Sequence, residues 1–457
     1  MIVIKFGGTS VGDAQRVANA IDIVAERRER DPIVVVSALA GVTNDLVAST
    51  EAACEGDMAR VNEIVERVRR RHEDVAMRLV QQKFDFFDTF LKNLHRQIEE
   101  IHTILHGIAL LREITPRAKD KVTGIGEKLS SVLFAYSMMM RALPGEHVDS
   151  EEVVVTDGRF GEATPLMNET RAAAERVLRP IVERHHIPVM GGFIGRTKDG
   201  ATTTLGRGGS DYSAAIVGAA VGAEEIQIWT DVDGMMTCDP RLIPGARVIE
   251  RISYVEAAEL AWFGAKVLHP KTIAPAVERN IPVRVLNTHN VSSPGTEVSA
   301  AGDLRDAGPR AVAVKRGVSV VHMTSSRMLG AHGFLARLFA IFGELQVSVD
   351  LITTSEVSVS VTVDDTHNIG ELRARLERDG IDVSVVDDQC IIAIVGRNLM
   401  EDSMVGARVF EAMRGVPMTM FSLGTSGLNL SIVCDEKRAD DAVRAVHAAL
   451  FEAPVEV

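Results

Sequence analysis

The sequence predicts an α/β protein with a mostly parallel sheet, followed by two smaller ferredoxin-like modules. Over residues 1–290, short apolar segments alternate with helical stretches, which is the pattern of parallel strands joined by crossover helices. Beyond residue 312 the pattern changes. Valines alternate with polar residues from Val357 to Val363, as they do in a half-buried antiparallel strand. The segment 291–312 carries turn-forming residues without a clear period and is expected to link the two regions.

Residues 1–290 are expected to form one large domain. The segment 33–36 is apolar throughout, which predicts a strand buried on both faces of the sheet. Few turn signals follow Gly56, so residues 45–115 are expected to be helical. Further strands are expected at 2–4, 153–155, 187–190 and 226–229.

The C-terminal region contains an internal repeat. Residues 336–339 match residues 407–410, and residues 354–361 match residues 425–432, both at a separation of 71 positions. Two matches at one separation indicate a repeated structural unit. Each unit reads strand, helix, strand, strand, helix, strand, which predicts ferredoxin-like βαββαβ modules. Their expected bounds are 313–387 and 388–457.

Composition excludes several classes of protein. The 457 residues are 46% hydrophobic and 25% charged, as in globular proteins, and the net charge of −13 argues against a general nucleic-acid binder. No apolar run reaches the roughly 18 residues of a membrane helix, and the N-terminus does not read as a signal peptide. The four cysteines lie far apart, so reduced thiols and a cytoplasmic location are expected. No metal site is predicted, because the histidines lack partners at ligand spacing.

A glycine pair follows the first strand. In the segment 5–10, Lys5 precedes Gly7 and Gly8, where the strand turns into a helix. Paired glycines let backbone N–H groups approach a phosphate, and a helix N-terminus favours negative charge. The lysine stands before the glycines, unlike the lysine of the G-x-x-x-x-G-K-[ST] loop. A simple turn is the alternative interpretation.

The segment 202–211 is the most informative one. It joins three threonines, three glycines, one arginine and one aspartate, and it leads into a helix. Ser210 or Asp211 could cap that helix. Capping does not explain Arg207, since a guanidinium on a bare glycine loop suits bidentate capture of a carboxylate or phosphate.

Three further residue groups are weaker candidates. Asp231 and Asp233 follow a strand, where open α/β sheets bind ligands, but they lack the remaining ligand spacing of a calcium loop. Glu127 stands at an expected helix start, where a carboxylate also compensates the helix dipole. Lys266 follows a glycine and, taken alone, reads as a surface residue.

Together these motifs resemble the aspartate kinases of the amino-acid kinase superfamily, and the repeat is similar to the two ACT modules of that family. The resemblance covers essentially the whole chain and implies the three-layer amino-acid-kinase sandwich. The motifs that carry it, in family order, are 5–10, 37–44, 126–127, 204–211, 229–234 and 263–270.

The resemblance implies phosphoryl transfer from ATP, with Mg²⁺, to the side-chain carboxylate of L-aspartate. The product would be 4-phospho-L-aspartate, the first step toward lysine, threonine and methionine. A carboxylate is already a nucleophile, so catalysis would consist of positioning and charge neutralisation. A homodimer or homotetramer formed through the ACT modules is also implied.

Site residues follow from the same resemblance. The residues implied in catalysis are Lys5, Gly8, Arg207, Asp211 and Lys266. Those implied in aspartate binding are Ser37, Thr43, Glu127, Arg207, Gly208, Gly209 and Ser210. Those implied at the nucleotide are Lys5, Phe6, Gly7, Gly8, Thr230, Asp231, Met236, Arg241, Lys266 and Val267. Met236 departs from the tyrosine that many relatives carry, so ring stacking on the adenine is not expected there.

An amino-acid effector, lysine first and threonine second, is expected in the first repeat. At the repeat separation, Asp350 corresponds to Phe421 and Glu356 to Gly427, so only the first repeat has carboxylates for an ammonium group. Two solvated turn carboxylates are the alternative interpretation. The sequence reads Gly330-Ala331 where lysine-inhibited relatives often have His-Ser, which leaves the effector open. The implied contacts are Met328, Gly333, Phe334, Leu335, Val349, Asp350, Thr354, Ser355 and Glu356.

Two other functions compete with a regulated aspartate kinase. One is an inactive amino-acid sensor that retains the ACT pair, against which the complete set of catalytic candidates argues. The other is a sister kinase acting on acetylglutamate, glutamate or a nucleoside monophosphate, against which the ACT pair argues.

Overall fold

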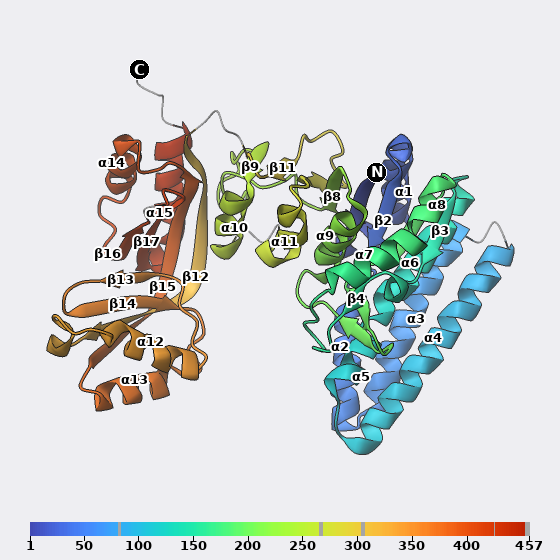
Figure 1. Ribbon diagram of the computed structural model, residues 1–457, viewed down its shortest axis with the longest axis horizontal. Helices are drawn as coiled ribbons and strands as arrows, with labels where there is room; N and C mark the ends of the chain where they lie inside the picture. The colour runs from blue at the N-terminus through green and yellow to red at the C-terminus, as the bar shows by residue number, and fades with distance from the viewer. Residues whose placement is uncertain (81–83, 265–267, 303–306, 425, 453–457) are drawn as a thin grey trace. The chain divides into compact units, whose positions relative to one another are not determined.

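The computed structural model describes residues 1–80, 84–264, 268–302, 307–424 and 426–452. The chain divides into two compact units (Figure 1). Unit 1 comprises Met1–Met235, Glu250–Tyr254 and Val267–Gly302, and unit 2 comprises Met236–Ile249, Val255–Lys266 and Asp303–Val457. Among the described residues, no helix is both long enough and apolar enough to span a membrane.

Unit 1 is built on an eight-stranded, mostly parallel sheet. The strand order is β3-β5-β2-β1-β8-β10-β11-β9, and only β10 and β11 pair in antiparallel fashion. A separate small sheet has the order β4-β6-β7. The strands are β1 (Ile2–Phe6), β2 (Pro32–Val36), β3 (Gly145–Val148), β4 (Val155–Thr156), β5 (Ile187–Gly191), β6 (Ile194–Thr197), β7 (Thr202–Thr204), β8 (Glu225–Thr230), β9 (Arg251–Ser253), β10 (Val283–Asn287) and β11 (Thr296–Ser299).

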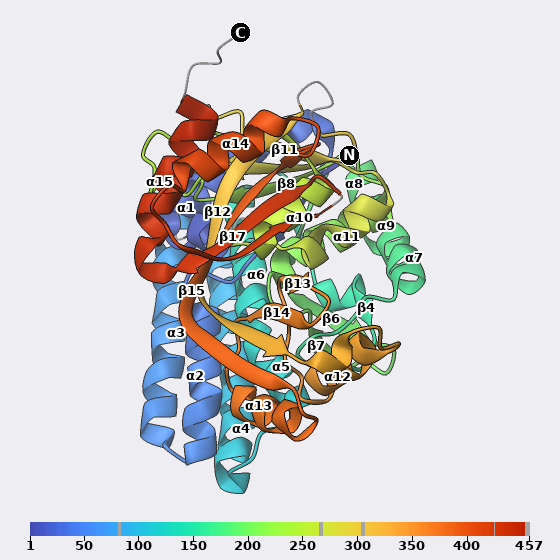
Figure 2. The same cartoon turned by 90° about the vertical axis from the view of Figure 1, so that its left-hand side faces the viewer.

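Helices cover both faces of the large sheet. The long helices α3 and α4 run side by side on the outside of the unit (Figures 1 and 2). The α-helices of unit 1 are α1 (Ala14–Glu26), α2 (Val42–Glu55), α3 (Met58–Val80), α4 (Phe84–Leu111), α5 (Pro116–Thr123), α6 (Ile125–Met140), α7 (Met167–Val177), α8 (Arg179–Glu183), α9 (Gly209–Val221) and α11 (Pro270–Glu278). Helix α10 (Tyr254–Trp262) begins in unit 1 and continues into unit 2. Short 3₁₀ turns occur at Gly8–Val11, Arg28–Arg30 and Ser150–Glu152.

The central strand β1 shows how the two faces are separated. Ile2, Ile4 and Phe6 are buried in the same apolar cluster as α1 and α6. Successive side chains of a strand point to opposite faces, so Lys5 points to the other face, where it meets the first turn of α9. The unit therefore has the three layers that the sequence analysis predicted.

Unit 2 contains one six-stranded antiparallel sheet with the order β13-β14-β12-β15-β17-β16. Its strands are β12 (Gly308–Thr324), β13 (Ile352–Thr354), β14 (Ser358–Val363), β15 (Asp382–Arg397), β16 (Met418–Leu423) and β17 (Asn429–Asp435). Its α-helices are α12 (Phe334–Glu344), α13 (Ile369–Arg378), α14 (Ser403–Ala412) and α15 (Ala439–His447). Short turns lie at Ser326–Met328, Glu436–Arg438 and Ala448–Glu452.

The two ferredoxin-like modules share their two longest strands. In Figure 2, β12 and β15 run along the whole sheet. The first module consists of the last part of β12, the first part of β15, β13 and β14. In the second module, the first part of β12, Gly308–Lys315, pairs with Ile391–Arg397 of β15, which lies beside β17 and β16. The fourth strand of the second module therefore comes from the start of β12, whereas the sequence analysis expected it after α15. A register shift in β12 between Lys315 and Val318 marks the passage from one module to the other.

Residues 236–249 pack with unit 2, although the sequence analysis placed them in the first domain. Cys238 and Ile243 belong to the apolar cluster that contains Ile392 of β15. The backbone N–H of Val312 donates to the carbonyl of Thr237, with an N···O distance of 2.8 Å. Burial of its apolar side chains therefore explains why this segment packs with unit 2.

We predict that Gly191→Ala destabilises the protein, because α6 packs directly on the end of β5. A Cβ atom at Gly191 would lie 2.9 Å from the carbonyl oxygen of Glu127, so the helix would have to shift. Overpacking of this kind costs roughly 1–3 kcal/mol, which urea unfolding would measure. Gly107→Ala in α4 is the control. Among the described residues, nothing lies within 4 Å of its added Cβ, so the free energy of unfolding should rise by about 0.5–1 kcal/mol. Equal effects of the two substitutions would contradict the packing argument.

Candidate active site

A pocket of about 340 Å³ lies in unit 1, at the ends of β1 and β2 and the start of α9. Open α/β sheets bind ligands at the carboxyl ends of their strands, and this pocket has that position. The residues that line it are Lys5, Gly8, Ser37, Ala38, Leu39, Ala40, Gly41, Thr43, Asn44, Glu127, Phe193, Gly206, Gly208, Gly209, Ser210 and Asp211.

Lys5 and Asp211 form an ion pair at the wall of the pocket. The Lys5 side chain is 9% exposed, and its Nζ lies 2.5 Å from Oδ1 of Asp211. Asp211 belongs to the first turn of α9, where a carboxylate also faces the positive end of the helix dipole. The pair holds a cation at the pocket wall, in a position to meet a phosphoryl group.

The glycines after β1 bring the backbone close to its neighbours. A Cβ atom at Gly8 would lie 3.1 Å from the carbonyl oxygen of Ala38, so a side chain would crowd the loop after β2. The N–H of Gly7 donates to the carbonyl of Trp229 at 3.0 Å, which fixes the turn to β8. Phe6 differs from these glycines, because its ring is buried and stacks on Phe134 at 5.7 Å between centroids. Its side chain therefore belongs to the core and is turned away from the pocket.

Glu127 is a buried carboxylate without a cationic partner among the described residues. It lies in the first turn of α6 and is 3% exposed. The backbone N–H of Ala38 donates to the carboxylate, whereas Oε2 has no hydrogen-bond partner in the described structure. Burial raises the pKa of Glu127 to about 8. A buried oxygen without a donor is costly, so this atom is suited to a ligand that brings a positive charge.

Arg207 projects from a loop that has left-handed glycines on both sides. Gly206 has φ +78° and Gly208 has φ +67°, a backbone conformation that residues with a side chain rarely adopt. Arg207 is exposed and does not itself line the pocket, although both neighbouring glycines do. Gly208 is the N-cap of α9, and no side chain caps that helix end. The interpretation of Ser210 or Asp211 as the N-cap is therefore wrong. The N–H of Gly209 donates to the carbonyl of Gly206, and Ser210 and Asp211 line the pocket at a helix start, which is a position that favours an anion.

Ser37, in the loop after β2, and Thr43, in the first turn of α2, also line the pocket. The hydroxyl of Ser130, on α6, donates to the carbonyl of Ser37 at 2.7 Å. On the far side of the loop, the guanidinium of Arg71 donates to the carbonyl of Ala40. Contacts from two helices thus fix this wall.

The residues expected at the nucleotide are not all gathered at this pocket. Thr230 is the last residue of β8 in unit 1 and Asp231 follows it, and the Thr230 hydroxyl donates to Asp231 at 3.2 Å. Met236 and Arg241 belong to unit 2, and Arg241 pairs with Asp239 at 2.6 Å. Lys266 and Val267 lie outside the described residues.

Sequence reasoning missed several pocket residues. Leu39 and Asn44 belong to the motif 37–44 but were given no role of their own, and Phe193, which also lines the pocket, lies in none of the motifs. Asp120 was missed as well. It lies on α5 and bonds to the strand that leads to Arg207, and only its spacing of seven residues from Glu127 could have indicated it.

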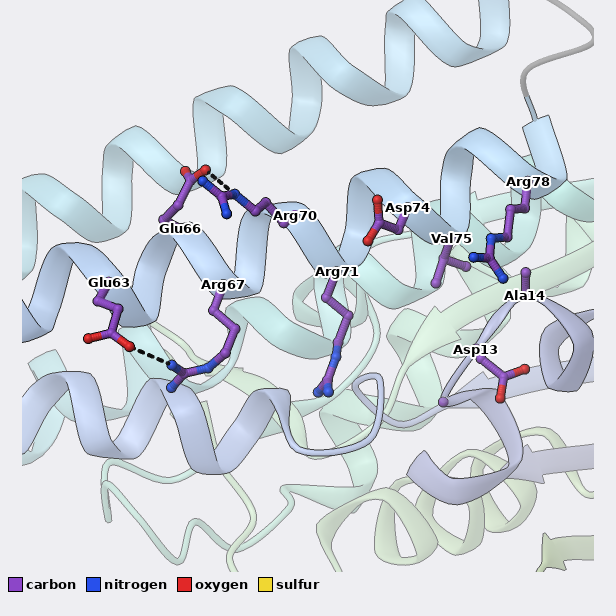
Figure 3. A pocket seen from close by; sticks show the side chains of 11 residues that line it. Asp13, Ala14, Glu63, Glu66, Arg67, Arg70, Arg71, Asp74, Val75 and Arg78 are labelled. Atoms are coloured by element: carbon purple, nitrogen blue, oxygen red, sulfur yellow. Dashed lines mark hydrogen bonds and ion pairs between the residues drawn. The ribbon is translucent and has the colours of Figure 1, made fainter.

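A larger cavity, of about 620 Å³, lies between α3 and the start of α1 (Figure 3). Arginines from four positions of α3 line it together with carboxylates. Arg67 lies 3.6 Å from Glu63, and Arg70 lies 2.6 Å from Glu66. Charges of both signs are balanced there, and neither a glycine-rich loop nor a helix N-terminus with free N–H groups like that of α9 faces the cavity. The smaller pocket is therefore the candidate active site.

The expected effector residues lie in unit 2, and its two carboxylates differ. Glu356 is exposed in the turn between β13 and β14. The side chain of Asp350 is only 2% exposed, and its oxygens accept from Nζ of Lys315 at 2.7 and 2.8 Å. The same ammonium lies 2.9 Å from Asp364 and 5.2 Å from the centroid of the Trp262 ring, whose side chain also bonds to Asp350. Asp350 is thus a paired, buried carboxylate, and the interpretation of two solvated carboxylates is wrong for it.

The remaining effector candidates surround the same region of the first module. Gly333 is the left-handed N-cap of α12, with φ +74°, and no side chain caps this helix. Phe334 and Leu335 form its first turn. Met328 ends a 3₁₀ turn, Val349 precedes β13, and Thr354 and Ser355 follow at its end.

Comparisons with known proteins agree with this architecture. A family model described as the amino acid kinase family matches residues 1–287, and a model of the ACT domain matches residues 321–368 and 392–450. The chain is 35% identical to chloroplastic aspartokinase 3 of Arabidopsis thaliana over 98% of its own length and 81% of that protein.

Solved structures of a bacterial relative share the fold. One is aspartokinase III of E. coli in complex with aspartate and ADP, called the R-state. It has a TM-score of 0.84 and 34% identity, with 99% of this chain and 100% of that chain covered. The same protein in complex with lysine and aspartate, called the T-state, gives a TM-score of 0.81 and 35% identity, with 99% of each chain covered.

The fold, the pocket and the family model define an amino acid kinase. With relatives that match along nearly the whole chain, the protein belongs to the aspartokinases of the amino acid kinase family.

We predict that the free energy of unfolding of Glu127→Gln, relative to that of the ligand-free wild type, increases as the pH rises. In the unfolded chain this carboxyl ionises near pH 4.5, whereas in the fold its pKa is about 8. Between these values the folded state holds the extra proton, so wild-type stability should fall by up to about 1.4 kcal/mol per pH unit from this group alone. Glutamine does not titrate. Urea unfolding at pH 5 to 8 should show the variant gaining on wild type with pH, whereas parallel profiles would contradict the burial of an unpaired carboxyl.

Proposed function

We propose that the pocket of unit 1 binds L-aspartate and that the chain transfers the γ-phosphoryl group of ATP to its side-chain carboxylate. The product would be 4-phospho-L-aspartate, the first step toward lysine, threonine and methionine. The observation that carries this proposal is the buried Glu127, whose Oε2 has no donor among the described residues, in the lining of the same pocket as Lys5 and the start of α9. An amino acid substrate has an ammonium group that can bind Glu127, and carboxylates that can bind Lys5 and the start of α9.

The roles divide by charge. Glu127 binds the substrate ammonium, and Arg207 closes on a substrate carboxylate, as an exposed guanidinium on a glycine loop can do. Lys5 neutralises the transferring phosphoryl group, and Asp211 holds Lys5 in place. The wall residues Ser37, Thr43, Gly208, Gly209 and Ser210 complete the substrate site, and Gly7, Gly8, Thr230, Asp231, Met236, Arg241, Lys266 and Val267 are assigned to the nucleotide.

The chemistry asks for positioning more than for a strong base. The attacking carboxylate is ionised at neutral pH, and negative charge spreads over the phosphoryl oxygens in the transition state. A lysine ammonium and backbone N–H groups fixed beforehand stabilise that charge without reorganising. These are the groups that line the pocket.

Mg²⁺ would enter with the nucleotide. Within the described ranges, no group of three or more His, Cys, Asp or Glu residues could hold a metal ion. Mg²⁺ usually keeps several waters and binds through phosphates with one or two carboxylates, so the single carboxylate of Asp211 fits such a site. When bound, the ion supplies charge neutralisation at the phosphates.

The domain assignment 1–290, 291–312, 313–387 and 388–457 stays a proposal for the order of domains along the chain. In space, residues 236–249 pack with unit 2 and Gly308–Lys315 pairs with the second module. A homodimer or homotetramer formed through the ACT modules, and a cytoplasmic location, complete it. The aspartokinase III complexes with aspartate, ADP and lysine support the choice of ligands.

Hydroxylamine trapping of the acyl phosphate tests the activity. Aspartyl hydroxamate should form only with both ATP and aspartate, and acetylglutamate and glutamate should give no hydroxamate. Nucleoside monophosphates, which would give no acyl phosphate, are tested by ADP release and should give none. Arg207→Lys should lower kcat/KM by raising its activation barrier by roughly 2–5 kcal/mol, because lysine keeps the charge and loses the planar fork. Product from another acceptor in the panel would overturn the choice of aspartate, and a fully active lysine variant would remove Arg207 from the substrate site.

We propose further that the first ACT module binds an amino-acid effector, with lysine preferred and threonine second. The effector's ammonium would compete with Lys315 for Asp350, and its carboxylate would meet the uncapped start of α12 at Gly333. The contact residues are the nine named above: Met328, Gly333, Phe334, Leu335, Val349, Asp350, Thr354, Ser355 and Glu356. Trp262, which touches both Lys315 and Asp350, stands four residues before Lys266 in the sequence.

We predict that lysine changes the fluorescence of Trp262. The chain has only two tryptophans, and the other, Trp229, is 1% exposed in the core of unit 1 and supplies a constant background. Displacing Lys315 from Asp350 changes the charge above the Trp262 ring, which is half exposed. Titration with lysine should therefore shift the emission of wild type, and Trp262→Phe should lose the shift while calorimetry still detects binding. An unchanged emission at saturating lysine would contradict competition for Asp350.

A further inference from the structure

Asp120 is a buried carboxylate that the proposed catalytic roles leave unused. It lies on α5 and is 2% exposed. No ion pair neutralises it within the described part of the chain. Three donors satisfy it instead: Oδ2 accepts from the backbone N–H of Gly161 at 2.9 Å and from that of Thr204 at 2.8 Å, and Oδ1 accepts from the hydroxyl of Thr204 at 2.8 Å. Three donors on one buried carboxylate make a rigid junction, because losing any of them leaves a buried polar atom unpaired.

The two segments that Asp120 joins both lead to the loop of Arg207. Thr204 is the last residue of β7 and stands three positions before Arg207. Gly161 packs against the same loop, since a Cβ atom added at Gly206 would lie 3.2 Å from the Gly161 carbonyl oxygen. Asp120 thus fixes both the strand that starts the loop and the turn that supports it.

The same helical segment carries Glu127. Helix α5 ends at Thr123, and α6 begins at Ile125 after a single glycine in helical conformation. That glycine, Gly124, is wedged against β6, because an added Cβ would lie 2.7 Å from Cγ2 of Ile194. Helix α5 also lies beside β7 (Figure 2). Asp120 and Glu127 are therefore seven positions apart on two helices that Gly124 joins directly.

We propose that Asp120 is a positioning residue that sets the distance between the Arg207 loop and Glu127, and so fixes the fit of the pocket to its amino-acid substrate. This inference rests on the proposed function, in which Arg207 and Glu127 bind the two ends of aspartate. An error of about 1 Å in such a pair can lower the rate on the order of a hundredfold. The nucleotide side of the site has no contact with this junction among the described hydrogen bonds.

The neighbouring threonines of β7 supply a matched control. Thr203 bonds to the hydroxyl of Thr156 at 2.7 Å, and both residues are buried. This bond stabilises the same strand, and it joins β7 to β4, away from α5 and Glu127. Thr156→Val should therefore cost stability without changing substrate binding.

The test compares the Michaelis constants for aspartate and ATP in four proteins: wild type, Asp120→Ala, Asp120→Asn and Thr156→Val. Asp120→Ala should raise the aspartate KM by tenfold or more and leave the ATP KM within twofold of wild type. Asp120→Asn should recover most of this loss, because its amide oxygen still accepts from the two backbone N–H groups and its NH₂ can donate to the Thr204 hydroxyl. Thr156→Val should lower the melting temperature and keep both constants.

The outcomes separate positioning from structural support. Equal changes in both KM values, or the same aspartate-specific change in Thr156→Val, would overturn the inference. If Asp120→Ala does not fold, Thr204→Val removes only the hydroxyl donor, and it should raise the aspartate KM by about twofold to fivefold with the ATP KM unchanged. A wild-type protein that does not phosphorylate aspartate would overturn the proposed function, whereas an active wild type with an unaltered Asp120→Ala variant would overturn this inference alone.

Discussion

The ion pair between Lys5 and Asp211 is the contact on which the arrangement of the pocket depends. It joins the central strand of the large sheet to the first turn of α9, across the face opposite the main apolar cluster. A charge on a strand buried on both sides is tolerated only when it is paired, so the lysine and the helix start must meet. This requirement places the uncapped N–H groups of α9 beside the glycines that follow β1. The other walls, formed by the loop after β2 and by α6, close around that fixed pair.

Much of the fold could be predicted from the sequence because its signals are local. The continuous apolar run at 33–36 predicted β2, the helical composition of 45–115 predicted the region of α2, α3 and α4, and the matches at a separation of 71 positions predicted the repeat. The strand expected at 153–155 proved shorter, since Ser150–Glu152 forms a 3₁₀ turn before β4. The shared strands of unit 2 were not predictable, because a sequence pattern shows that a strand exists and does not show which module it completes.

The residues of the site that stand in motifs could be predicted from the sequence, whereas their hydrogen-bond and ion-pair partners could not. Lys5, Glu127 and Asp211 were expected on different grounds, and the structure brings all three to one pocket. Asp120 carries no motif, since its importance comes from donors 41 and 84 residues away in sequence. The pairing of Asp350 with Lys315 was hidden for the same reason: a carboxylate in the sequence does not reveal whether a lysine 35 positions earlier already occupies it.

The strands that pass through both ferredoxin-like modules have a consequence for how this region can be exchanged or truncated. A fragment that starts at residue 388 would lack the strand Gly308–Lys315 and would expose one side of β15 along its hydrogen-bonding edge. Such an edge pairs readily with other chains and promotes aggregation. Recombination between relatives at the apparent border of the repeats would therefore separate a strand from its own sheet. The two ACT modules share their longest strands and therefore form one structural unit that cannot be divided without breaking a sheet.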